Sequence, residues 1–169
     1  AKLRKILPGD DFSGYQPYMV RSLYFDSYGN DDYADKMAGI LERKKIRIRV
    51  YSPEDKKAKL ELKQKSGDNQ RKQSLTISRE QAQDMIAGNY EFLLEMEGDL
   101  AKSIYYIMSK EVYRPKCIVS YTRRAFAVPT NNIRITFDSD IESSEGDFDL
   151  FSASSALTYT VDSKNMVVL

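Results

Sequence analysis

Histidine and tryptophan are both absent from this sequence of 169 residues, and cysteine occurs only once. Without histidine, the chain cannot contain a serine–histidine or cysteine–histidine catalytic pair, and it cannot bind a metal through imidazole. The single Cys117 allows no disulfide within the chain, which favours a reducing compartment. No apolar run approaches the roughly 18 residues that indicate a membrane-spanning helix. We therefore expect the protein to be cytoplasmic or to lie at the cytoplasmic face of a membrane.

The composition has no excess of either charge. Lysine and arginine number 26 and aspartate and glutamate 25, for a net charge of +1. The chain as a whole is therefore not a basic nucleic-acid binder, and any electropositive site must come from uneven placement of charge. The hydrophobic content of 41% is sufficient for a core, and the length suits one domain over residues 1–169.

The most informative stretches are two segments in which basic and apolar residues alternate. They are Lys44–Tyr51, KKIRIRVY, and Lys59–Lys65, KLELKQK. Alternation with a period of two predicts a strand with two different faces. A turn-like SPED sequence at 52–55 separates them, so we expect an antiparallel hairpin with one apolar and one cationic face.

Further strands and helices are expected on both sides of this hairpin. The predicted strands are Tyr18–Asp26, Arg71–Ile77, Lys116–Ala127, Ile133–Ile141, Ala156–Val161 and Met166–Leu169, with a turn at Pro129–Asn132. The predicted helices are Lys2–Leu7, a turn at Tyr33–Met37, a helix capped by Ser78 and Gln81 and stopped near Gly88, and Asp99–Val112, ended by Pro115. Many alternating strands without βαβ spacing predict an α+β protein with an antiparallel barrel or strongly curved sheet.

If the apolar faces of these strands pack outward against the helices, their polar faces bring many lysine and arginine side chains together on the inside. The inward set then holds eight cations and two carboxylates, namely Lys45, Arg47, Arg49, Lys59, Glu61, Lys63, Lys65, Tyr121, Arg123, Arg134, Thr136 and Asp138. Such a face suits a phosphate polyanion, because arginine binds phosphate oxygens bidentately and lysine adds point charges. Two simpler interpretations remain: a half-exposed basic hairpin, and a structural salt bridge from Glu61 to Arg47 or Arg49.

Five sequence blocks and one basic position, in this order, resemble the VTC domain, the polyphosphate polymerase domain of the triphosphate tunnel metalloenzyme superfamily. They are RSLYFD at 21–26, KxRxRxY at 45–51, LELKxK at 60–65, the basic pair Arg71-Lys72, YxR at 121–123 and RITFD at 134–138. Together they extend over most of the chain. No single block is specific, whereas their order and spacing are.

The resemblance implies an antiparallel tunnel of about eight strands with inserted helices and a basic bore. It implies binding of ATP with Mn²⁺ or Mg²⁺, and transfer of the γ-phosphoryl group to a growing polyphosphate chain. The implied phosphate ligands are Arg47, Arg49, Lys63, Lys65, Lys72, Tyr121, Arg123 and Arg134. Of these, Arg47, Arg49, Lys63 and Arg123 are the implied catalytic residues.

Two strands of the family pattern are missing from the sequence. The family begins with a strand carrying Glu and Lys, and ends with one whose Glu binds the metal, so we expect this chain to be truncated at both ends. The remaining inward carboxylates, Glu61 and Asp138, are candidate metal ligands because Mg²⁺ and Mn²⁺ prefer oxygen. Glu61 is equally a candidate to orient arginine or lysine.

Two alternative functions stay open at this stage. One is a tunnel-fold triphosphatase, and the other is a non-catalytic module that binds polyphosphate or another anion. Nucleic acid is not expected as a partner, because a narrow tunnel excludes duplexes. A membrane-protein partner is compatible with the family but not visible in the sequence.

Overall fold

The computed structural model describes residues 7–9, 13–128, 133–153, 159–160 and 168. Within these residues, one antiparallel sheet has seven strands in the order β4-β3-β2-β1-β5-β6-β7. The strands are β1 (Tyr18–Asp26), β2 (Arg43–Val50), β3 (Lys57–Ser66), β4 (Asn69–Ser78), β5 (Arg114–Val128), β6 (Ile133–Ser144) and β7 (Tyr159–Thr160). The helices are α1 (Asp31–Met37), α2 (Arg79–Ile86), the short 3₁₀ helix η2 (Glu91–Leu94) and α3 (Asp99–Lys110).

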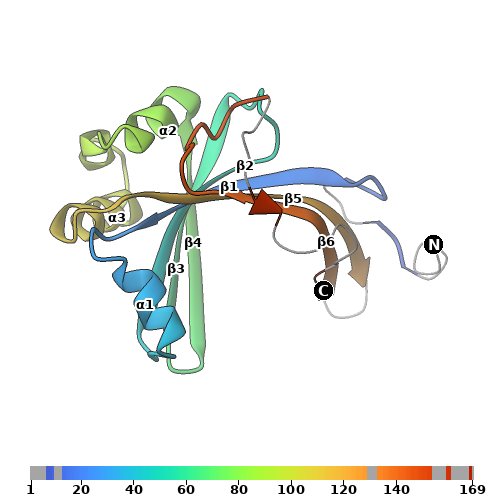
Figure 1. The fold of residues 1–169 in the computed structure, drawn as a ribbon, viewed down its shortest axis with the longest axis horizontal. Coiled ribbons are helices and arrows are strands. Elements are labelled where there is room, and N and C mark those ends of the chain that lie inside the picture. The colour runs from blue at the N-terminus through green and yellow to red at the C-terminus, as the bar shows by residue number, and fades with distance from the viewer. Residues whose placement is uncertain (1–6, 10–12, 129–132, 154–158, 161–167, 169) are drawn as a thin grey trace.

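The sheet is strongly curved and, in the part of the chain that is described, remains open. The hairpin of β3 and β4 runs at a steep angle to β5 and β6, which bend away on the other side of β1 (Figure 1). β4 and β7 lie at opposite edges and do not pair with each other. The α+β class and the curved antiparallel sheet predicted from the sequence are confirmed, in the form of a partial barrel.

The apolar faces of the basic strands form the core with the helices, as predicted. Ile46, Ile48 and Leu60 have no exposed surface, and neither do Met85 of α2 and Ile104 of α3. Figure 1 shows α2 and α3 together on one side of the sheet. The opposite face of β2 and β3 is therefore left to the basic side chains.

Most predicted element boundaries agree with the structure to within a few residues, but one stop signal is wrong. Pro115 does not end the second long helix, because α3 already ends at Lys110 and Pro115 lies inside β5. Val112, with φ of 50°, turns the chain before the strand starts. Pro115 is accommodated where the pairing of β1 with β5 shifts register, since a sheet irregularity tolerates a missing N–H donor.

Several predicted segments fall wholly or largely outside the described residues. These are the helix Lys2–Leu7, the turn Pro129–Asn132 and the strands Ala156–Val161 and Met166–Leu169. Of the two strands, only residues 159–160 in β7 and Val168, which bridges to Asp138, are described. η2 was not predicted.

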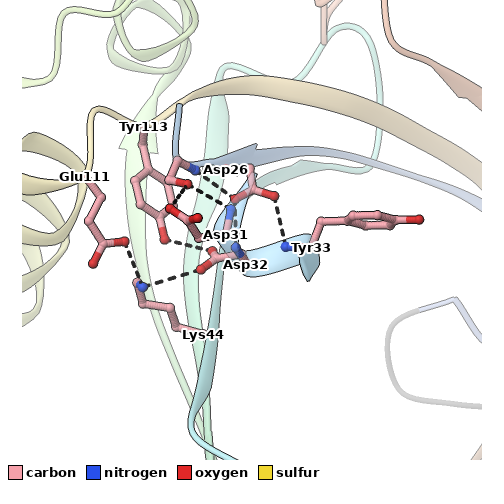
Figure 2. A network of polar contacts seen from close by, with 8 residues as sticks. Asp26, Asp31, Asp32, Tyr33, Lys44, Glu111 and Tyr113 are labelled. Atoms are coloured by element: carbon pink, nitrogen blue, oxygen red, sulfur yellow. Dashed lines mark hydrogen bonds and ion pairs between the residues drawn. The ribbon is translucent and has the colours of Figure 1, made fainter. Parts of the chain in front are cut away.

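A carboxylate at the end of β1 anchors helix α1 (Figure 2). Asp26 is buried and accepts hydrogen bonds from the backbone N–H groups of Ser27, Asp32 and Tyr33, at 2.8, 3.0 and 3.1 Å. These donors lie at or just before the first turn of α1, where helical N–H groups lack partners within the helix. Asp26 thus ends the RSLYFD block as a helix-capping residue.

A second layer of contacts fixes α1 from the side of β2 and β5 (Figure 2). The Tyr113 hydroxyl donates to Asp32 at 2.8 Å, and Lys44 Nζ lies 3.4 Å from Asp32 and 2.9 Å from Glu111. Burial raises the pKa of Asp32, and its contacts with Tyr113 and Lys44 oppose that rise. The helix is therefore held firmly at one end of the sheet.

The predicted N-terminus of α2 gives a direct test of the fold. Ser78 Oγ accepts from the Gln81 N–H at 3.1 Å, and Gln81 Oε1 accepts from the Ser78 N–H at 2.9 Å. Replacing Ser78 with alanine should lower the free energy of unfolding by about 1 kcal/mol, because a helix N–H loses its acceptor. Urea denaturation measures this, with Ser74→Ala on exposed β4 as the control. Equal effects of the two substitutions would contradict the capping role.

Candidate functional site

The register of the sheet brings the predicted cations onto one face. Across β2 and β3, Arg47 lies opposite Glu61 and Lys45 opposite Lys63. Across β3 and β4, Lys63 lies opposite Lys72. Because side chains opposite each other in antiparallel strands share a face, these residues form one basic surface, on the side away from the α2–α3 core.

Glu61 is the centre of this basic surface. Its side chain is only 3% exposed, and three cations from the two neighbouring strands, β2 and β4, surround it. Arg47 Nε donates to Glu61 Oε2 at 2.6 Å, and Arg49 Nη2 lies 3.6 Å from the same oxygen. Lys72 Nζ lies 2.9 Å from the other carboxylate oxygen. The interpretation of Glu61 as a partner that orients arginine and lysine therefore has direct geometric support.

Strand β1 supplies polar contacts to the two arginines from the opposite side. Arg47 Nη1 donates to the Tyr24 hydroxyl at 2.8 Å, and Arg49 Nε lies 3.4 Å from Ser22 Oγ. Burial by itself would lower the pKa of Arg49, but the charge of Glu61 and a hydrogen bond with Tyr51 outweigh it, so the pKa is raised. Both guanidinium groups stay charged and are held in fixed orientations, which suits bidentate phosphate binding.

Tyr24 and Ser22 are site residues that the sequence-based assignment missed. Alternation within YMVRSLYFD places both residues on one face of the strand, and this alternation is the sequence signal that could have identified them. The pairing of β1 beside β2, which sets Tyr24 opposite Arg47 and Ser22 opposite Arg49, was not predictable from that pattern.

Lys45 and Lys63 differ from the arginines because they have no anionic partner. No ion pair or hydrogen bond engages either ammonium group in the described part of the chain. Burial lowers the pKa of both lysines, and nearby cations lower it further. For Lys63 these cations include Lys72 and Arg49, while Glu61 acts in the opposite direction. The two half-buried lysines therefore leave positive charge uncompensated on this face.

A second group of predicted residues lies on β5 and β6. Arg123 binds Asp138 through two hydrogen bonds of 2.7 Å, from Nε and from Nη2. The hydrogen bond with Asp138 is the main reason that the pKa of Arg123 is raised. Tyr121 lies at a register shift between β5 and β6, and the Arg123 guanidinium carbon is 5.1 Å from its ring centroid. An irregular strand position of this kind redirects a side chain.

Tyr121 connects the two groups electrostatically. Burial raises its pKa, and the positive charges of Arg123 and Arg49 act in the opposite direction. Arg134 lies farther along β6, where its Nη2 donates to the Tyr18 hydroxyl at 2.7 Å. Lys65 lies near the end of β3 and lines a pocket of about 470 Å³ with Arg43 and Arg71. Arg134 and Lys65 are thus at the periphery of the surface that Glu61 and Arg123 occupy.

The two candidate metal ligands are poorly suited to that role as they stand. Both oxygens of Glu61 face cations, and both oxygens of Asp138 accept from Arg123. Among the described residues, no group of three or more acidic or cysteine side chains forms a metal site. The assignment of Glu61 and Asp138 as metal ligands stays a prediction.

The fold and this surface define a class of protein in which a curved antiparallel sheet carries ordered arginines and lysines on one face. The sequence model of the VTC domain matches residues 1–169, and the chain belongs to the VTC domain family, within the tunnel-fold superfamily. Members of this superfamily generally bind nucleoside triphosphates and polyphosphate-like anions, and generally depend on divalent metals.

Comparisons with individual proteins add little to the family match. A search among curated proteins found no match. A crystal structure from Bacillus halodurans, described as that of a candidate adenylate cyclase, is similar with a TM-score of 0.48 and 13% identity over 76% of this chain. The chain spans 59% of that protein. None of the described helices is of a length and apolarity that would let it span a bilayer.

The position of Glu61 at the centre of the network predicts that its substitution lowers stability more than substitution of its exposed partner Lys72. Glu61→Ala leaves the buried Arg47 without its carboxylate and should lower the free energy of unfolding by about 3–5 kcal/mol. Lys72→Ala removes a side chain that is 53% exposed and should cost less than about 1 kcal/mol. Urea titration of both variants measures the difference. Similar losses would show that Glu61 is not the centre of the network.

The lysine pKa values predict a pH dependence of anion binding. Because the pKa of Lys63 is lowered, this side chain loses its charge at a lower pH than an exposed lysine. As the pH rises, the affinity for tripolyphosphate should therefore weaken before the pH of about 10.4 at which an exposed lysine loses half of its charge. Lys63→Arg should flatten this dependence, because arginine stays charged. Calorimetric titration at a series of pH values measures both curves, and identical slopes would exclude Lys63 as the titrating contact.

Proposed function

We propose that this domain carries the active site of an ATP-dependent polyphosphate polymerase, which transfers the γ-phosphoryl group of ATP to a growing polyphosphate chain. The observation that most supports this proposal is the basic face on which Glu61 holds the buried Arg47 and Arg49 in fixed positions and also contacts the more exposed Lys72. Membership of the VTC family supports the same substrate class. We place the protein in the cytoplasm or at the cytoplasmic face of a membrane, where a membrane protein is a candidate partner.

The chemistry of the reaction suits a site without histidine. A terminal phosphate oxygen of the chain attacks the γ-phosphorus, the bond to the bridging β–γ oxygen breaks, and ADP leaves with the electron pair. This reaction depends on positioning and on cations matched to the charge of the transition state, more than on covalent catalysis. Preorganised side chains on strands meet both demands.

The predicted phosphate ligands have roles that follow from their environments. Arg47, Arg49 and Arg123 are locked by Glu61, Ser22, Tyr24 and Asp138, so their planar donors would orient phosphate oxygens. Lys63 lacks an anionic partner and would add charge directly to the phosphates. Tyr121 would donate a hydrogen bond, while Lys65 and Arg134 would contact phosphates farther along the chain. Lys72 shares Glu61 with Arg47 and can turn to a ligand.

Product analysis separates polymerisation from the alternative functions. The full-length protein incubated with ATP and Mn²⁺ or Mg²⁺ should yield long-chain polyphosphate that is resolved on a gel. Release of phosphate or pyrophosphate without chain growth would instead identify a triphosphatase. Tight polyphosphate binding with no turnover would identify a binding module. Either of the last two results would overturn the proposal.

Lys63 offers a variant that separates function from stability. Lys63→Ala should reduce polymer formation by roughly tenfold to a hundredfold, because a charge that faces the phosphates is lost. Its free energy of unfolding should stay the same or rise, since the side chain repels its neighbours. Lys110→Ala, on the exposed end of α3, is the matched control and should leave both quantities unchanged. Loss of stability together with activity would indicate a structural role for Lys63.

A further inference from the structure

A pocket beside α1 adjoins the basic surface at one end of the sheet. Its volume is about 600 Å³, within the range of pockets that bind small molecules. Its lining includes Tyr24, Cys117 and Val119 from the sheet and Tyr33 and Lys36 from α1. Tyr24 belongs to both places, because it lines the pocket while its hydroxyl accepts a hydrogen bond from Arg47. The pocket is therefore contiguous with the arginine cluster.

The charges around this pocket are balanced, which favours a neutral ligand group over an anion. Three lysines and three carboxylates line it, namely Lys36, Lys45, Lys116, Asp26, Asp32 and Glu145. Asp26 and Asp32 are already engaged by the backbone of α1 and by Tyr113. Glu145 is exposed and supplies a hydrogen-bond acceptor at the rim. The pocket thus differs in chemistry from the basic surface beside it.

One wall of the pocket is largely apolar. Tyr24 and Cys117 lie opposite each other across β1 and β5, and Val119, two residues from Cys117, lies on the same face. All three residues are half-buried. Burial raises the pKa of the Cys117 thiol, so this group stays neutral and behaves as a small apolar side chain. The wall therefore offers an apolar surface against which a planar ring can pack.

Tyr33 supplies an aromatic ring on the α1 side of the pocket. The residue is 60% exposed, and in the described part of the chain no ring or cation contact engages it. Figure 2 shows its ring pointing away from the network that fixes α1. Its backbone N–H donates to the buried Asp26 at 3.1 Å, so the ring extends from a fixed helix start. Exposed aromatic rings of this kind are stacking surfaces for nucleobases, because every base has a π face.

We propose that this pocket binds the nucleobase of ATP, which stacks on Tyr33 while the triphosphate extends past Tyr24 to Arg47. The inference rests on the proposed function for the identity of the nucleotide. Lys45, at the pocket, lies two residues from Arg47 along β2, or about 7 Å, so one nucleotide spans both places. The edge of adenine carries donors and acceptors, which the lysines and Glu145 at the rim complement. The pocket gives the domain a means to distinguish ATP from a phosphate chain that has no base.

The variant Tyr33→Ala tests the pocket by comparing two ligands that differ in the nucleoside. Dissociation constants are measured at one ionic strength and one Mg²⁺ concentration for a nonhydrolysable ATP analogue and for tripolyphosphate. The variant should bind the ATP analogue about tenfold more weakly, because the stacking contact is lost. Its affinity for tripolyphosphate should stay within about twofold, since that ligand has no base. Tyr33→Phe keeps the ring and should bind the analogue as tightly as the unmodified protein.

The matched control is Tyr106→Ala, because Tyr106 lies on α3 and is 64% exposed. It should leave both dissociation constants unchanged, and urea midpoints verify that all variants are folded. Unchanged binding of the analogue by Tyr33→Ala would overturn the assignment. So would weakening of tripolyphosphate binding by as much or more, or equal weakening by the control. Because binding is measured without turnover, failure of the full-length protein to form polyphosphate would overturn the proposed function and leave this result intact.

Discussion

The balance of charge around one buried carboxylate determines how this domain presents its basic face. Glu61 is almost without solvent contact, and so are Arg47 and Arg49 beside it. Removing such charges from water is unfavourable unless they are paired and hydrogen-bonded. The pairing requires β2 and β3 to stay in one register, since a shift by one residue would place Glu61 on the opposite face. The arrangement of the arginines and the alignment of the strands therefore depend on the same contact.

Only some of the positive charges on this surface are paired with partner groups. Arg47, Arg49 and Arg123 have carboxylate, hydroxyl or tyrosine partners, which keep them charged and oriented. Lys45 and Lys63 have none, and their lowered pKa values reflect burial among other cations. An anion that binds here relieves repulsion that the free protein tolerates. The domain thus combines a rigid group of arginines with a set of lysines that favours a ligand of high negative charge.

The sequence allowed the strands and their two faces to be predicted well, because alternation reports directly on which side chains share a face. It left open whether Glu61 binds a metal or orients arginine, since this depends on register and on contacts from β4. Pro115 was misread as a helix stop, because the left-handed Val112 and a register shift decide that junction. The pocket beside α1 that Tyr24, Lys45 and Cys117 line was not predicted, because it arises where residues from distant parts of the sequence meet and no local pattern reports such a meeting.

The contacts of strand β1 limit which substitutions this domain can accept during evolution. Ser22 and Tyr24 contact the arginines, whereas Leu23 and Phe25 are buried in the core and Asp26 caps α1. Arg21 points to the helix side and donates to the backbone oxygens of Leu150 and Ser152. Every residue from 21 to 26 therefore makes contacts on one of the two faces of the sheet. Substitutions that retune the ligand site have little freedom here, so we expect specificity to diversify through the periphery of the sheet and through α1.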